Sequence, residues 1–74
     1  MIQEDLMNED VFNASLRKFL KKVGVNGQRA IEETVREAVA KGRLKGSEKL
    51  PAKMVLTLGG VSLSYEVTDE IELG

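Results

Sequence analysis

The sequence predicts an α+β fold in which a two-helix hairpin packs on a small antiparallel β-hairpin or three-stranded sheet. Residues 8–42 carry apolar side chains at helical spacing in two stretches, separated by residues 25–27. Residues 52–67 alternate apolar and polar side chains on both sides of Gly59 and Gly60, which is typical of two paired strands. Each pattern is apolar on one side only. Helices and sheet are therefore expected to cover each other.

The first helix is expected to begin after Asn8, a good N-cap, with Glu9 and Asp10 in the first turn, where the helix dipole favours negative charge. Gly24 is expected to end this helix as a left-handed cap. An apolar stripe runs along it at helical spacing: Phe12, Leu16, Phe19, Leu20 and Val23.

The second helix is expected to run from Gly27 to Lys41, with Asn26 as its N-cap and Gly42 as its terminator. Two helices joined by so short a connector form an αα-hairpin. The charges of this helix pair at i,i+4, as Glu32 with Arg36 and Glu37 with Lys41. Its stripe repeats the spacing of the first: Ile31, Val35, Ala38, Val39 and Gly42.

With Gly59 and Gly60 as a two-residue loop, Leu58 pairs with Val61, and Lys53 faces Glu66 on the polar side. The opposite face is apolar: Ala52, Met54, Leu56, Leu58, Val61, Leu63, Tyr65 and Val67. Pro51 lacks an N–H and suits the start of an edge strand. A three-residue loop over residues 68–70 would allow residues 71–73 to add a third strand. The expected order is ααββ, with or without this third β.

Composition argues against catalysis. The chain has no Cys and no His, so it lacks disulfides and the usual zinc ligands. No histidine is present to activate a serine. A cluster of carboxylates near the C-terminus lacks the spacing of a calcium loop: Glu66, Asp69, Glu70 and Glu72. We therefore expect no cofactor, no metal and no enzymatic activity.

The net charge of −1 conceals an uneven distribution. All eleven Lys and Arg residues fall in residues 17–53, which hold only four Glu, so this segment carries +7 while both ends are acidic. Arg17, Lys18, Lys21 and Lys22 lie opposite or beside the first apolar stripe. They form a candidate face for an anionic partner. The alternatives are that the acidic ends and the basic middle neutralise each other in the fold, or that this basic face is only solvated surface.

These observations favour a small protein-interaction or self-associating module. The alternative is a nucleic-acid-binding, winged-helix-like domain, in which the two helices resemble a helix-turn-helix and the basic middle contacts phosphates. Against it, the second helix brings Glu32, Glu33 and Glu37 toward those phosphates. No run approaches the ~20 apolar residues of a membrane span, and the acidic start differs from a signal peptide. A cytoplasmic location without membrane contact is expected.

Several segments resemble a family of short, uncharacterised bacterial proteins: MNEDVFN at 7–13, LRKFLKKVGV at 16–25, LPAK at 50–53, LTLGGVSLS at 56–64 and EIEL at 70–73. The resemblance implies a bacterial cytoplasmic protein that starts at Met7. Residues 1–6 would then be a disordered N-terminal extension of a single domain over residues 7–74. The family has no assigned activity, so it implies no site residue. Its members have Asp-Gly where this chain has Thr68 and Asp69, which implies a tight last turn.

Overall fold

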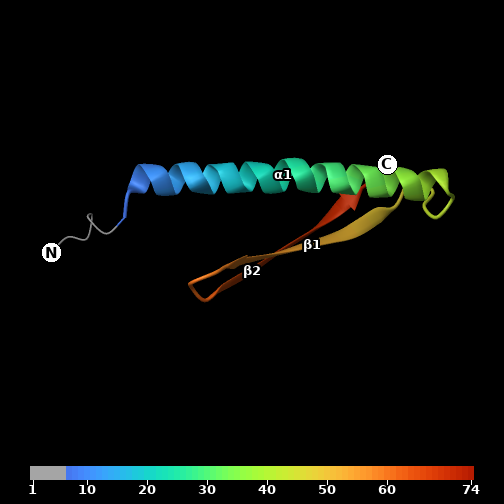
Figure 1. Cartoon of the computed structure of the whole chain (residues 1–74). Coiled ribbons are helices and arrows are strands. Elements are labelled where there is room, and N and C mark those ends of the chain that lie inside the picture. The colour runs from blue at the N-terminus through green and yellow to red at the C-terminus, as the bar shows by residue number, and fades with distance from the viewer. Residues whose placement is uncertain (1–6) are drawn as a thin grey trace. The chain divides into compact units, whose positions relative to one another are not determined.

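The computed structural model describes residues 7–74, so the expected extension over residues 1–6 lies outside the described residues. It contains one helix, α1 (Glu9–Ala40), and two strands, β1 (Lys49–Leu58) and β2 (Leu63–Glu72), that pair antiparallel (Figure 1). The chain divides between Glu37 and Ala38 into two compact units. The helix and the hairpin are therefore described separately.

The predicted two-helix hairpin is wrong, because α1 is one continuous helix of 32 residues. Gly24 does not act as a cap, and Asn26 does not start a second helix. Two glycines inside a helix cost roughly 2 kcal/mol relative to alanine. Nucleating a second helix is a thousandfold unfavourable step, about 4 kcal/mol. One helix that continues through the glycines is therefore lower in free energy than two separately nucleated helices.

The phase of the apolar stripe also favours one helix. Val23, Gly27 and Ile31 are four residues apart, so they follow one another along a single face of a continuous helix. The two predicted stripes thus become one, with Gly27 at their junction. We call this set the α1 stripe: Phe12, Leu16, Phe19, Leu20, Val23, Gly27, Ile31, Val35, Ala38 and Val39.

Both outer ends of the helix lie where the sequence predicted them. The N–H of Val11 donates to Asn8 Oδ1 at 3.1 Å, which confirms the N-cap. At the other end Gly42 has a φ of 79°. The N–H of Gly42 donates to Val39 O (3.1 Å) and that of Arg43 to Ala38 O (2.8 Å). This pair of bonds is the Schellman motif, and it confirms Gly42 as the terminator.

The hairpin has the predicted faces but a different register. Leu58 pairs with Leu63 rather than with Val61, so the loop has four residues, 59–62. A two-residue type I′ turn needs positive φ at both central positions, whereas of this glycine pair only Gly60 is in that region, with a φ of 91°. A slip of two residues keeps the side-chain alternation. The apolar face therefore survives the change of register, except that Val61, predicted on this face, lies in the loop.

The predicted third strand is also wrong. Residues 68–70, expected as a loop, continue β2 opposite residues 51–53, and Ile71 pairs with Leu50. The N–H of Leu73 donates to Glu48 O at 3.0 Å, just beyond the strand. The two-residue shift in register brings the start of β1 opposite this segment. Its backbone groups are then paired in the existing ladder, and no turn is required.

Candidate functional site

The predicted basic face lies on a fully exposed segment of α1. Arg17, Lys18, Lys21 and Lys22 are all exposed, and none of them forms an ion pair with another residue of the described range 7–74. Arg17 and Lys21 are four residues apart, as are Lys18 and Lys22, and like charges at this spacing cost tenths of a kcal/mol. The structure thus brings the four cations together on one helix segment. Their binding of an anionic partner stays a prediction.

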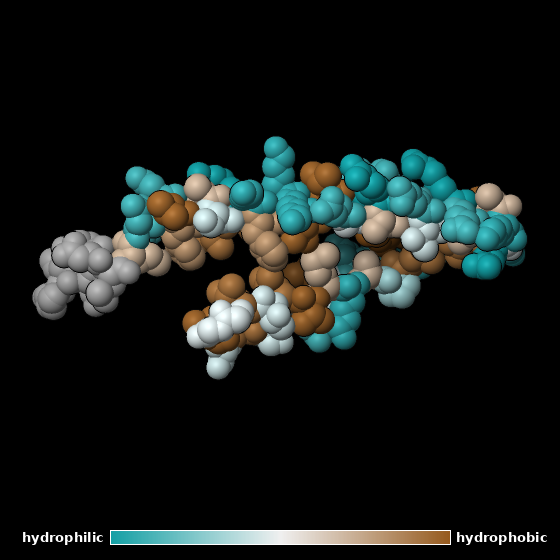
Figure 2. All heavy atoms as spheres, viewed as in Figure 1, coloured by the Kyte–Doolittle hydropathy of each residue, from teal (hydrophilic) through white to brown (hydrophobic). Residues whose placement is uncertain are grey.

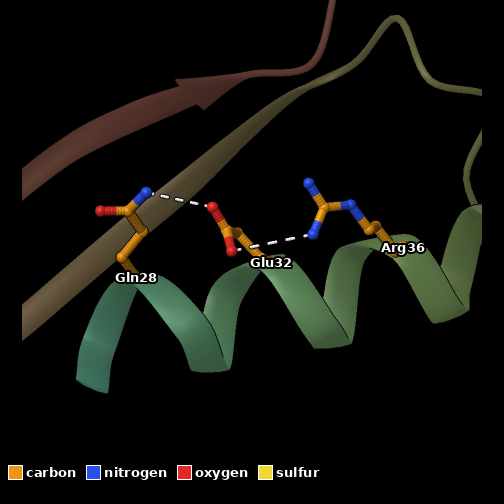
Figure 3. Close-up of polar contacts among 3 residues, drawn as sticks. All are labelled: Gln28, Glu32 and Arg36. Atoms are coloured by element: carbon orange, nitrogen blue, oxygen red, sulfur yellow. Dashed lines mark hydrogen bonds and ion pairs between the residues drawn. The ribbon is translucent and has the colours of Figure 1, made fainter. Parts of the chain in front are cut away.

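An acidic segment lies farther along the same helix, at residues 32–37. Glu32 is held between two neighbours (Figure 3): Gln28 Nε2 donates to its Oε2 at 3.0 Å, and Arg36 Nη1 lies 3.7 Å from its Oε1. The predicted pair of Glu32 with Arg36 is confirmed. The Arg36 side chain of this ion pair is 76% exposed, so the pair stabilises the helix only slightly.

Apolar side chains lie at the surface of both elements (Figure 2). Among residues 7–74 none is buried, and sixteen large apolar side chains are exposed. On α1, Phe19 and Leu20 are 48% and 55% exposed, and on the hairpin Tyr65 is 59% exposed. Neither α1 nor the hairpin, taken by itself, encloses a buried core.

The sequence predicted the two halves of the α1 stripe but missed their continuity. The signal was present in the spacing of Val23, Gly27 and Ile31, which is uninterrupted helical spacing. A Cβ built on Gly24 or on Gly27 would meet no atom within 4 Å. Gly27 therefore leaves a stretch of bare backbone in the middle of the stripe.

On the polar side of the hairpin, the predicted charge pair is present although its register differs. Lys53 Nζ lies 3.4 Å from Glu66 Oε2, but Lys53 is opposite Thr68 and Glu66 is opposite Val55. The pair is therefore diagonal, a separation that long side chains can span. Both side chains are more than half exposed, so the pair contributes little to stability.

A second polar feature, which the sequence did not suggest, precedes β1. The carboxylate of Glu48 accepts the N–H groups of Lys45 (2.8 Å), Gly46 (3.0 Å) and Ser47 (3.2 Å). These bonds lower the pKa of Glu48, and the bond from Lys45 has the largest effect. Gly46 has a φ of 99°. A Cβ built on Gly74 would lie 2.7 Å from the carbonyl oxygen of Gly46. Because the carboxylate is already engaged with the backbone, we interpret this loop as structural.

The C-terminal carboxylates do not gather at one point. Asp69 alternates to the opposite face of β2 from Glu66, Glu70 and Glu72, and its Oδ1 accepts the N–H of Glu70 at 2.7 Å. Within residues 7–74 there is no group of three or more side chains that could hold a metal ion. Over the same residues, no helix is long and apolar enough to cross a membrane.

Residues 7–74 match the sequence model of a family of unknown function, DUF6494. The chain belongs to this family. The match spans all the segments on which the resemblance was based, and it confirms that the resemblance is to an uncharacterised family. DUF6494 has no assigned function, so membership transfers no catalytic or binding residue. No curated protein and no solved structure is significantly similar to the chain.

Proposed function

We propose that this domain is a protein-association module whose apolar faces are covered by another protein chain, and that it is not an enzyme. The observation that carries the proposal is the absence of any buried residue among residues 7–74. Contiguous exposed apolar surface on a folded chain marks interaction sites. A two-stranded hairpin is also only marginally stable by itself in water. A partner would therefore stabilise the fold as well as use it.

The magnitude of the apolar term supports this proposal. Fully burying one large apolar side chain is worth about 1.5–3 kcal/mol, so covering the exposed half of one is worth about 1 kcal/mol. The α1 stripe offers six such exposed side chains: Phe12, Leu16, Phe19, Leu20, Ile31 and Val39. Association costs about 4–15 kcal/mol before any gain. Only a partner that covers most of the stripe would bind stably.

The winged-helix alternative has lost its basis, because α1 continues through the residues that were to form the turn. Residues 7–74 contain no separate recognition helix, and we do not carry that function forward. The proposed non-catalytic role is supported by the absence of histidine and cysteine from the chain. A cytoplasmic site of action belongs to the same proposal, and fractionation of cells that express the protein would test it.

The test is the dependence of folding on protein concentration. If a second chain covers the apolar faces, the melting temperature followed by circular dichroism should rise with concentration, because association stabilises the folded state by mass action. Sedimentation equilibrium on the same samples should show species larger than the 8.2 kDa chain. A monomer that melts cooperatively at one temperature at every concentration would contradict the proposal.

A further inference from the structure

Six residues of the α1 stripe are placed symmetrically about Gly27, whereas the mirror positions of Phe12, Leu20 and Val39 are Gly42, Thr34 and Ser15, outside the stripe. Val23 and Ile31 lie four residues from it, Phe19 and Val35 eight, and Leu16 and Ala38 eleven. We propose that two copies of this chain pair through α1 in antiparallel orientation, with Gly27 opposite Gly27. This inference rests on the proposed function and adds the identity of the partner and its orientation.

Mirror symmetry of this kind is what an antiparallel pair of identical helices requires. In such a pair a residue a given number of positions before the centre meets the residue the same number after it. Phe19 then meets Val35, and Leu16 meets Ala38, so a large side chain faces a smaller one at each level. Gly27 has no side chain and no neighbour within 4 Å of a built Cβ. The two backbones could therefore approach closely at the centre.

The charges favour the same orientation. Lys21 lies six residues before Gly27 and Glu32 five after it, and Lys22 and Glu33 lie five before and six after. At about 100° per residue, Lys21 and Glu32 lie about 120° and 140° round the helix from Gly27 in one direction, whereas Lys22 and Glu33 lie about 140° and 120° from it in the other. Antiparallel pairing brings like sides together, so each Lys lies on the same side of the dimer as a Glu of the second copy, at nearly the same level along the helix axis. Parallel pairing in register would place the basic face beside itself.

Lys18 provides an internal comparison. It lies nine residues before Gly27, and Arg36 lies nine after it, but both side chains point away from the stripe. Arg36 is already paired with Glu32 of its own helix. The proposed pairing therefore gives Lys18 no acidic partner, although Lys18, like Lys21, is an exposed lysine of α1.

Disulfide trapping tests the arrangement, because the chain has no native cysteine. Leu16→Cys chains mixed with differently tagged Ala38→Cys chains should form a mixed disulfide under mild oxidation. Leu16→Cys alone should not cross-link, since the two sulfurs would lie about 33 Å apart along the helices, far beyond disulfide reach. The matched control mixes Lys18→Cys with Arg36→Cys, which should not cross-link because both face away from the stripe.

Charge reversal gives a second measurement that leaves the stripe intact. Lys21→Glu should raise the dissociation constant of the dimer about three- to tenfold, Glu32→Lys should do the same, and the two together should restore it. Lys18→Glu is the control and should leave the dissociation constant unchanged. Equal effects of Lys18→Glu and Lys21→Glu would overturn the proposed pairing.

The outcomes separate this inference from the proposed function. A dimer that traps Leu16 against Leu16 overturns the antiparallel arrangement and leaves the association module intact. A dimer that traps neither pair overturns the pairing centred on Gly27 and leaves the association module intact. A monomer at all concentrations overturns this inference, and if that monomer also melts cooperatively it overturns the proposed function as well, because the fold then requires no second chain.

Discussion

Replacing Gly24 by Ala tests the continuous helix through the sign of its effect on stability. Gly24 lies inside α1, its φ is not positive, and an added Cβ meets nothing within 4 Å. Alanine in a helix interior is more favourable than glycine by about 0.5–1 kcal/mol. For a domain of this size, that gain raises the melting temperature by roughly 2–8 °C. If Gly24 instead ended a helix in the left-handed region, Gly24→Ala would destabilise the protein by about 1–2 kcal/mol.

The assay is thermal and urea unfolding followed at 222 nm, with all variants at one concentration. Gly42→Ala is the matched control, because Gly42 has a φ of 79° at the end of the same helix and should lose about 1–2 kcal/mol. The reasoning is refuted if Gly24→Ala and Gly42→Ala destabilise the protein alike. A turn at residues 24–27 would then be present in solution.

Three other sets of variants test the N-terminus of the helix, the Glu48 loop and the basic face. Asn8→Ala should cost about 1 kcal/mol and reduce helicity, whereas Asn8→Asp keeps a capping oxygen and should not; equal losses would contradict the cap. Because its pKa is lowered in the folded state, Glu48 stabilises the fold above its unfolded pKa of 4.5, and this contribution is lost as the pH falls through the folded value. Glu48→Gln should therefore destabilise the protein at neutral pH and flatten the acid side of its stability profile, and an unchanged profile would rule this out. Replacing Arg17, Lys18 and Lys21 together by Gln should preserve helicity and weaken association with an acidic partner, most strongly at low salt; unchanged association at every salt concentration would identify the face as solvated surface.

What the sequence determined was local chemistry. Asn8 and Gly42 mark the outer ends of α1 because a side-chain acceptor and a left-handed glycine act on backbone groups a few residues away. The two faces of the hairpin followed from alternation alone, which any even shift of register preserves. The absence of cysteine and histidine limited the chemistry of the chain before any fold was considered.

What only the structure decided was how these local pieces join. Gly24, Asn26 and Gly27 suit a turn as well as a helix interior. The choice depends on whether nucleating a second helix costs more free energy than keeping two glycines inside one continuous helix. Alternation could not distinguish Leu63 from Val61 as the partner of Leu58, because the two are two residues apart and an alternating pattern assigns them to the same face. The pairing of Leu58 with Leu63 follows only from the loop conformation at Gly60 together with the pairing of residues 68–72 with residues 49–53. Those pairings join residues far apart in the chain, and a local pattern carries no information about them.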